Sequence, residues 1–354
     1  MLTANRIQFF LGSNTGAGFR SYFNELLGPD ADCRLFILKG GPGTGKSSLM
    51  KKIAAALEAR GDTVTYVHCA SDPGSLDAVI DPEARIAVAD GTSPHTLDPR
   101  CPGAAELIFN AGDGWDAGKL VANKKEIALL SNAISIRHGR ATSCIKAADA
   151  LLENNRRVAE GYVDRAAVSE FVWDFFHGLE REGVGREKTR LLSAVSVGET
   201  VFFENTLHLL SRKIYAITDE YGAAAHLLIG ELRRAALSLG VNVVACPCSV
   251  SAEPKLEHLI LPAFGTSFTS VNSFHGDAAG KAELPSFMRP IPARADESRM
   301  RAHLETARML IAEAASEVAD AKLLHDELEA YYVRAMDFSC LDRIRERILS
   351  SAGL

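Results

Sequence analysis

Residues 40–47 read GGPGTGKS, a glycine-rich segment that ends in a lysine and a hydroxyl side chain. Glycines at this density let the backbone curl so that successive amide groups point inward, where they can donate hydrogen bonds to phosphate oxygens. The ammonium group of Lys46 can then reach the terminal phosphates of a nucleotide. The pattern therefore predicts a nucleotide-phosphate site. Its expected contacts are Gly40, Gly41, Pro42, Gly43, Thr44, Gly45, Lys46, Ser47 and Ser48.

The segments on either side of this loop should position it. Residues 34–39, RLFILK, have the apolar content of a short strand, and residues 48–60, SLMKKIAAALEAR, place apolar side chains on one face of a helix that ends at Gly61. A helix that begins directly after the loop adds its positive N-terminal end to the phosphate site. The expected order is strand, glycine loop and helix.

A magnesium ion needs a second oxygen ligand besides the Ser47 hydroxyl. Residues 62–69, DTVTYVHC, predict a second strand, and residues 85–90, RIAVAD, predict a third strand that ends in Asp90. An acidic side chain at the end of such a strand holds Mg²⁺ through water in nucleotide hydrolases. We therefore expect Ser47 and Asp90 to hold the metal, with ATP as the nucleotide because no N/T-K-x-D guanine signal is placed to serve the loop.

The residue that would activate water is less clear. The chain continues GTSPH after Asp90, without the glutamate that many hydrolysing motor ATPases place there, so fast hydrolysis is not expected. Beside Lys46, which would stabilise the developing charge, a base could come from His68, Asp72, Asp77 or His95. We select Asp72 and His68 as candidate catalytic residues.

This selection rests on an internal repeat. Residues 34–69 align without a gap to residues 213–248, and with one inserted residue the match continues to His95 and His275. The second copy lacks the residues expected to serve the nucleotide and metal. The paired positions are Lys46 with Ala225, Ser47 with His226, His68 with Pro247, Asp72 with Ser251 and Asp90 with Ser270. His95 persists as His275, which favours a shared structural role and predicts one nucleotide per chain.

The repeat divides the chain into two α/β domains. The first covers residues 1–186 with a helical arm at about 116–180, and the second covers residues 187–354 with a C-terminal helical arm at about 293–350. Apolar residues in both arms recur every three or four positions, a spacing typical of packed helices. A role for the arms in partner binding or as a lid is the alternative.

Composition excludes several classes of protein. The 354 residues are 47% hydrophobic and 24% charged, and 39 basic against 45 acidic side chains give a net charge of −6. These values argue against a disordered chain and give no strong nucleic-acid signal. We expect no membrane span, no signal peptide and no disulfide framework from the seven scattered cysteines, and hence a cytoplasmic protein.

Several segments together resemble a family of uncharacterised bacterial tandem P-loop NTPases, described as ATPases or nucleotide-kinase-like proteins. They are FFLGSNTGAGF, FILKGGPGTGKSSLMKKI, YVHCASDPGSLDAVI, VADGTSPH and LLHDELEAYYVRAMDF. The resemblance implies two tandem P-loop-NTPase-like domains with parallel sheets, each with a helical, coiled-coil-like excursion. Family members often keep a recognisable loop in both halves, whereas this chain has lost the second.

Three functions remain open. The first is a slow Mg-dependent ATPase whose nucleotide state drives a conformational change. The second is a nucleotide or small-molecule kinase, for which Arg137, Arg140, Arg156 and Arg157 of the first arm could form a closing lid. The third is a nucleotide-gated binding or scaffold protein without useful turnover. Each would act on a protein or small-molecule partner that the sequence does not identify.

Overall fold

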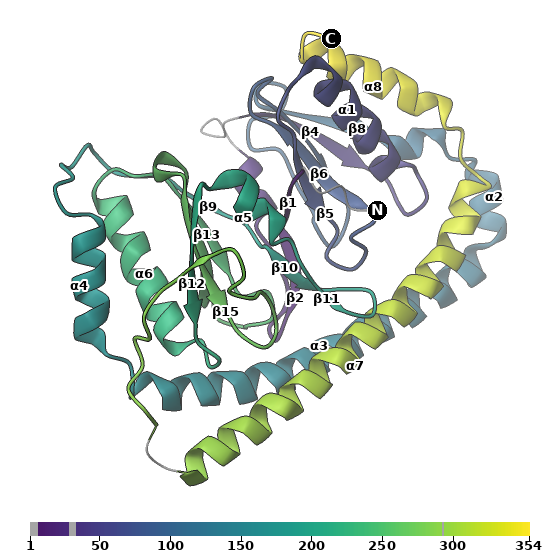
Figure 1. Ribbon diagram of the computed structural model, residues 1–354. Coiled ribbons are helices and arrows are strands. Elements are labelled where there is room, and N and C mark those ends of the chain that lie inside the picture. Colours follow the sequence, from purple (N-terminus) through teal and green to yellow (C-terminus); the bar gives the residue numbers. More distant parts are fainter. Residues whose placement is uncertain (1–5, 28–32, 292–293) are drawn as a thin grey trace.

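Two α/β lobes lie side by side, and one pair of long helices runs along both of them (Figure 1). This is the arrangement in a computed structural model that describes residues 6–27, 33–291 and 294–354. Each lobe contains a six-stranded sheet of mostly parallel strands. The α/β class predicted from the sequence is therefore confirmed.

The first sheet has the strand order β1-β5-β6-β7-β4-β8. Its strands are β1 (Ile7–Phe10), β5 (Thr65–His68), β6 (Leu76–Asp81), β7 (Ile86–Asp90), β4 (Arg34–Lys39) and β8 (Glu106–Asn110). Strand β6 runs antiparallel to both of its neighbours, and the other pairs are parallel. The prediction of a purely parallel sheet is therefore wrong at this strand, because the short turn between β5 and β6 allows the chain to return directly beside the strand it has left.

The second sheet repeats this order strand for strand, as β9-β13-β14-β15-β12-β16. Its strands are β9 (Glu187–Thr189), β13 (Val243–Pro247), β14 (Leu256–Leu261), β15 (Thr266–Val271), β12 (Lys213–Thr218) and β16 (Ala282–Glu283). Strand β14 is antiparallel to both neighbours, as β6 is. The internal repeat read from the sequence is thus a repeat of topology, including the one strand that departs from the parallel pattern.

Each lobe also carries a two-stranded hairpin, β2 (Gly12–Thr15) with β3 (Gly18–Ser21) and β10 (Ser193–Val195) with β11 (Thr200–Phe202). The two lobes are joined by backbone hydrogen bonds between Phe10 and Leu191, with N···O distances of 2.8 and 2.9 Å. The short helices are η1 (Phe23–Leu26), η2 (Ala111–Gly114), α2 (Ala117–Ala122), α4 (Arg165–Phe175), α5 (Asn205–Leu210) and η3 (Pro262–Phe264).

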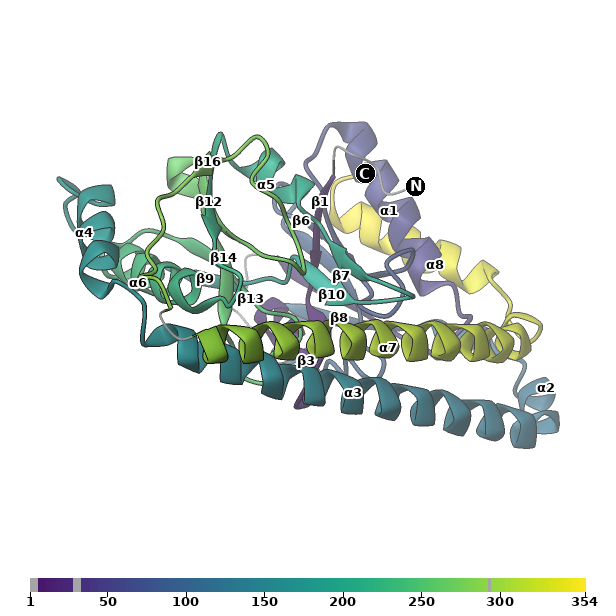
Figure 2. The ribbon, with the colours of Figure 1, turned by 60° about the horizontal axis from the view of Figure 1, so that its bottom comes forward.

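The two predicted helical arms pack against each other. Helix α3 (Lys124–Glu160) and helix α7 (Arg294–Val333) lie antiparallel along much of their length, as Figure 2 shows. Arg137 of α3 pairs with Glu317 of α7 at 3.0 Å, and further along α3 the side chain of Asn155 donates to the Met300 carbonyl at 2.7 Å. Small apolar side chains fill the seam, which explains why both arms show helical periodicity. They are Ala141, Ile145 and Ala148 of α3 with Ala307, Ile311, Ala314 and Val318 of α7.

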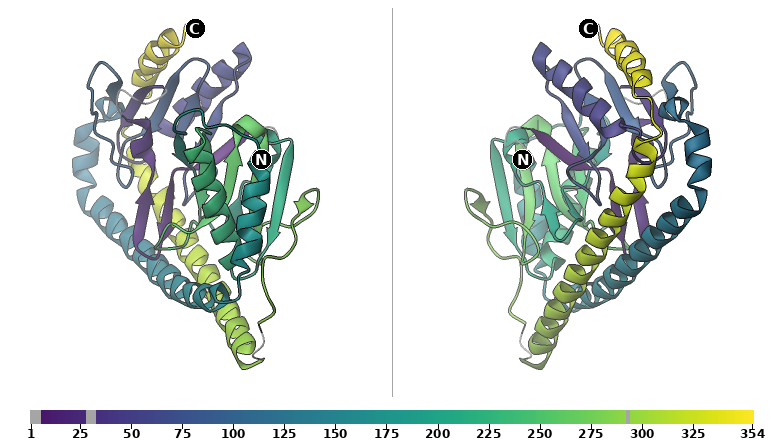
Figure 3. Two further views of the ribbon diagram at one scale, coloured as in Figure 1. Left: turned by 90° about the vertical axis from the view of Figure 1, so that its left-hand side faces the viewer. Right: turned by 90° about the vertical axis from the view of Figure 1, so that its right-hand side faces the viewer.

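The last helix, α8 (Ser339–Ser351), returns to the first lobe (Figure 3). Its residues Leu341, Ile344 and Ile348 share a core with α1 (Lys46–Arg60) and the first sheet. The helix of the second lobe that corresponds to α1 is α6 (Ala223–Ser238). The predicted division at residue 187 does not match the packing of two helices: α8 lies after it but packs on the first sheet, and α4 lies before it but packs on α6 of the second lobe.

Among the residues that the structure describes, no helix combines the length and the apolar character needed to cross a lipid bilayer.

Candidate nucleotide-binding site

The glycine segment forms the turn between β4 and the N-terminus of α1, as the sequence predicts. Gly40, Gly43 and Gly45 have φ angles of 149°, 66° and 79°. Residues with a Cβ rarely adopt this region, so the path of the loop requires glycine at these three positions. Gly45 directly precedes the first residue of α1, and the loop therefore ends where the positive end of the helix dipole begins.

Lys46 is folded back over this loop. Its Nζ lies 2.7 Å from the carbonyl oxygen of Gly40 and 2.8 Å from that of Gly41, and it lies 3.5 Å from Oδ2 of Asp90. The side chain is only 10% exposed. A buried ammonium group is thus held in the curve of the loop by oxygens alone, at a position where an anionic ligand could replace the two carbonyls as its partner.

Asp90 reaches the loop because β7 lies beside β4 in the first sheet. In that pairing Leu38 stands opposite Asp90, so the carboxyl ends of the two parallel strands meet at the same edge. One oxygen of Asp90 accepts a hydrogen bond from the Thr92 amide at 2.8 Å, and the Thr92 hydroxyl donates to the Gly40 carbonyl at 2.7 Å. Burial raises the pKa of Asp90, although Lys46 and Thr92 act in the opposite direction.

Ser47 occupies the first turn of α1, next to Lys46. Its hydroxyl oxygen accepts a hydrogen bond from the backbone amide of Leu76 at 2.9 Å, which ties the loop to the start of β6. The structure therefore brings Lys46 and Asp90 together, and Ser47 directly follows Lys46 in the chain. The sequence predicts the phosphate and metal site from these three residues.

Helix α7 and the residues after it cover the mouth of the loop. The backbone amide of Gly43 donates to Oε1 of Glu329 at 3.1 Å, and a Cβ at Gly43 would lie 2.9 Å from the Glu329 carbonyl oxygen. Tyr332 lies beside Gly41 and Gly43, and Phe338 lies beside Gly45. One amide of the loop is therefore already bonded to an anionic oxygen from the protein itself.

Asp72 lies in the turn between β5 and β6. Its carboxylate accepts hydrogen bonds from the Gly74 amide at 3.1 Å and the Ser75 hydroxyl at 2.9 Å, and it lies 3.7 Å from Nζ of Lys322 on α7. Asp72 thus stabilises the turn and links it to α7. None of these contacts joins Asp72 to the glycine loop.

His68 lies away from this group, in the interface between the lobes. Its Nδ1 is 2.6 Å from the Pro73 carbonyl, its Nε2 is 3.0 Å from Nε2 of Gln8, and its ring packs 4.8 Å from that of Phe203. Burial lowers the pKa of His68. Both ring nitrogens of His68 are therefore engaged by groups outside the glycine loop, and no contact joins His68 to Lys46 or Asp90 among the interactions of the described residues.

His95 is part of a buried pair with Asp77, with 3.0 Å between Nε2 and Oδ2. The second lobe contains the same pair as His275 and Glu257, also at 3.0 Å. In both lobes a phenylalanine of the neighbouring hairpin packs on the histidine ring. This equivalence is what a shared structural role for the two histidines predicts.

The turn of the second lobe that corresponds to the glycine loop is closed by its own carboxylate. Oδ1 of Asp219 accepts hydrogen bonds from the amides of Tyr221 and Gly222, and Oδ2 accepts one from the amide of Ala225, at 3.2, 3.1 and 3.0 Å. Asp219 aligns with Gly40, and Ala225 with Lys46. The amides that would face a phosphate in this lobe are therefore occupied by a buried side chain.

Sequence reasoning did not identify Glu329, Tyr332 or Phe338 as residues of this site. They belong to the C-terminal segment LLHDELEAYYVRAMDF, which the sequence analysis quotes only as part of a family resemblance. Nothing in its local pattern indicates contact with a loop almost 300 residues earlier, as the separation of 286 between Gly43 and Glu329 shows. Sequence reasoning also did not identify the role of Asp219. A polar residue in a degenerate copy of a motif does not by itself indicate that it accepts hydrogen bonds from the surrounding amides.

Comparison with known proteins gives one match. The family model described as Nephrocystin 3, N-terminal, matches residues 19–79, a span that includes β4, the glycine loop, α1 and β5. The match covers a minority of the chain. No curated protein and no solved structure shows significant similarity to it.

Proposed function

We propose that the protein is a P-loop NTPase that binds MgATP at residues 40–47 and hydrolyses it slowly, and that its nucleotide state sets the position of α7 and α8. The observation that carries this proposal is the convergence of Lys46, the glycine-loop amides and Asp90 at the carboxyl ends of β4 and β7. Two segments remote in the sequence meet there with the residue types that phosphoryl transfer requires.

The loop would hold the phosphates through its amides and Lys46. On binding, the ammonium group exchanges the carbonyls of Gly40 and Gly41 for phosphate oxygens, which strengthens its hydrogen bonds because both partners are then charged. Ser47 and Asp90 are the residues that would hold Mg²⁺, and the ion would neutralise charge on the phosphates. The buried position of Lys46 increases the strength of these interactions.

The base and ribose would lie between α1 and α8. A cavity of about 410 Å³ opens there, and Gly45 and Ser48 line it at the end of the glycine loop. Phe338 and Arg345 line the opposite wall, so the cavity offers an aromatic ring and a cation at a distance from the phosphates. A nucleotide lying across Gly45 would therefore contact both the first lobe and the C-terminal helix.

Nucleotide binding competes with Glu329 in this scheme. The Gly43 amide cannot donate fully to the Glu329 carboxylate and to a phosphate at once, and the two anions repel each other. Binding therefore favours a state in which the end of α7 has moved from the loop. Because α7 also packs along α3 and lies against the second lobe, this movement would transmit the nucleotide state beyond the site.

Slow hydrolysis fits the groups around the loop. Gly91 follows Asp90, and Asp72, our candidate base, is held by its own turn and by Lys322. Displacement of α7 would remove Lys322 from Asp72 and leave that carboxylate free to accept a proton. The contact of Glu329 with the loop also favours an alternative function, that of a nucleotide-gated binding protein without useful turnover.

A titration and a turnover assay test the proposal together. We expect MgATP to bind the wild-type protein in calorimetry, with weak binding in the absence of Mg²⁺, and phosphate release to be slow but measurable. Lys46→Ala should abolish both, whereas Lys125→Ala, an exposed lysine of α3, should change neither. Binding without phosphate release would select the gated binding protein, and equal binding by Lys46→Ala would contradict the proposed site.

A further inference from the structure

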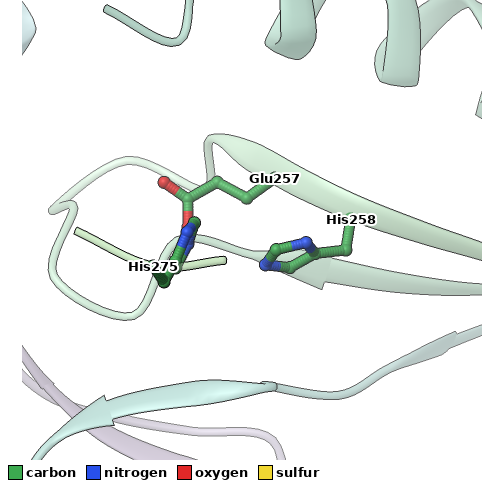
Figure 4. Close-up of side chains that lie close together, drawn as sticks. All are labelled: Glu257, His258 and His275. Atoms are coloured by element: carbon green, nitrogen blue, oxygen red, sulfur yellow. The ribbon is translucent and has the colours of Figure 1, made fainter. Parts of the chain in front are cut away.

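Glu257, His258 and His275 form a cluster of potential metal ligands in the second lobe (Figure 4). Glu257 and His258 are neighbours on β14, and His275 follows β15. One carboxylate oxygen and one ring nitrogen from each histidine lie within 4.8 Å of one another. Two ligand atoms of a tetrahedral zinc ion are about 3.4 Å apart, so these side chains would have to move together by about 1 Å to bind one ion.

The ring nitrogens of this cluster are incompletely bonded. Nδ1 of His258 lies 2.7 Å from the Thr269 hydroxyl oxygen, whose own hydrogen faces the Ser270 carbonyl at 3.4 Å. With Nδ1 engaged by Thr269, Nε2 is the nitrogen of the His258 ring that remains to bind an ion. That Nε2 has no hydrogen-bond partner, and His258 is 1% exposed. Buried polar atoms without partners are rare and costly, and a missing ion is one explanation for them.

Thr269 fixes the orientation of the His258 ring from behind, as a second layer of hydrogen bonds does for many zinc-bound histidines.

The first lobe provides a natural comparison. Asp77 and His95 there reproduce the Glu257–His275 pair, but Ala78 occupies the position of His258. The acid–histidine pair is thus common to both lobes, whereas the third donor occurs only in the lobe that has lost the phosphate loop.

The surroundings leave room for a fourth ligand. Lys255 lies 3.1 Å from Oε1 of Glu257 and balances part of its charge, while Oε2 faces His275. A cavity of about 50 Å³ adjoins the cluster and is lined by Cys248, Ser249 and Asn272. That volume can hold one water molecule, the usual fourth ligand of a zinc ion with three protein ligands.

We propose that Glu257, His258 and His275 bind one Zn²⁺ ion, with a water molecule from the adjoining cavity as the fourth ligand. Binding releases the proton that His275 shares with Glu257, because the ion takes the place of that proton between the two side chains. The site is independent of the nucleotide proposed for the first lobe.

The experiment measures Zn²⁺ binding to full-length protein that has been freed of metal with a chelator. We expect about one Zn²⁺ per chain in calorimetry, with proton release, and a Co²⁺ derivative with the visible absorption of tetrahedral cobalt. His258→Ala should weaken binding by more than about 100-fold, and Thr269→Val by about 10- to 100-fold through loss of the bond to Nδ1. His95→Ala, the matched change in the first lobe, should retain full affinity.

A second group, His325 with Asp326 and Glu329 on α7, could also attract metal ions. His325→Ala therefore serves as a further control and should leave the tight site intact. Absence of stoichiometric Zn²⁺ binding by the wild-type protein would overturn the proposal, and so would an ion lost with His325→Ala but kept with His258→Ala. The wild-type and Thr269→Val measurements decide the question even if His258→Ala does not fold.

Discussion

The carboxylate of Glu329 accepts a hydrogen bond from the backbone amide of Gly43 at 3.1 Å, across 286 residues of sequence. This contact places an acidic side chain of α7 against the loop where we propose that phosphate binds. If phosphate binds as proposed, the end of α7 competes with the nucleotide, and the strength of that competition can be measured.

Glu329→Ala should bind MgATP about 10- to 150-fold more tightly than the wild-type protein, because a hydrogen bond to a charged acceptor contributes about 1.5–3 kcal/mol and the nucleotide no longer has to break it. Glu329→Gln keeps an acceptor but removes the repulsion, so its affinity should lie between the two. Glu327→Ala, an exposed glutamate on the same helix, is the control. Unchanged affinity in Glu329→Ala would show that α7 does not oppose binding. Calorimetric titration provides the measurement.

One nucleotide should bind per chain. The second lobe has Ala225 where the first has Lys46, and Asp219 already occupies the amides of its turn. Asp219→Ala should leave the ratio at one, since freeing these amides does not restore a lysine. It should also destabilise the protein by about 1–3 kcal/mol, because buried amides lose their acceptor. A titration ratio of two in the wild-type protein would refute this interpretation.

Asp90→Asn should reduce the Mg²⁺-dependent part of ATP binding more than the Mg²⁺-independent part. The substitution removes the charge that would hold the ion through water but keeps the shape of the side chain and an acceptor for the Thr92 amide. We expect the fold to survive, which the thermal unfolding midpoint without nucleotide would verify. Equal loss of binding with and without Mg²⁺ would instead indicate that Asp90 acts by positioning Lys46.

The Asp77–His95 pair should make stability depend on pH. Burial by itself lowers the pKa of His95, but the Asp77 carboxylate raises it by a larger amount. The pKa of His95 therefore lies above its ordinary value. A group whose pKa is raised by folding stabilises the protein fully below its unfolded pKa of about 6.5, and this contribution is lost as the pH rises through the folded-state pKa.

The free energy of unfolding of the wild-type protein should therefore exceed that of Asp77→Asn most at about pH 6 and progressively less toward about pH 9. Urea unfolding of both proteins across this range measures the difference, in which the titration of all other groups largely cancels. A difference that stays constant or grows with pH would contradict a charged His95.

Ile348→Ala should destabilise the protein by about 2–5 kcal/mol, since Ile348 is fully buried in the core that α8 shares with α1. Leu323→Ala is a suitable control because that side chain on α7 is 65% exposed and should change stability by less than about 0.5 kcal/mol. Similar small effects of both substitutions in chemical denaturation would show that α8 does not belong to the core of the first lobe.

Local sequence patterns predicted the helices and strands that form because of residues close together in the chain. Strands β4, β5 and β7 lie within the predicted ranges, helix α1 begins two residues before its predicted start at residue 48, and the repeat anticipated that the second lobe would copy the first. Strand β6 was missed because LDAVID carries acids at 77 and 81, which interrupt an apolar pattern. Their partners become visible only in the fold, where Asp77 meets His95 and Asp81 accepts hydrogen bonds from the turn amides of Glu83 and Ala84.

Long-range packing accounts for what the sequence could not predict. The apolar stripes of both arms were evident in the sequence, but a stripe of alanine and isoleucine does not specify which helix it will pack against. In the structure α3 and α7 pack against each other. The engaged nitrogens of His68 and the contact of Glu329 with Gly43 depend in the same way on segments that are distant in the chain. The glycine loop is therefore predicted by its motif, whereas its contact with α7 is visible only in three dimensions.

The return of α8 to the first lobe has a consequence for biosynthesis. During translation the first sheet and α1 leave the ribosome well before α8, so the apolar face that Leu341, Ile344 and Ile348 will cover stays open while the entire second lobe is made. The nascent first lobe therefore keeps an incomplete core until α8 has been synthesised. Apolar surface that is exposed during synthesis promotes aggregation, so this interval is a vulnerable stage in the folding of the first lobe.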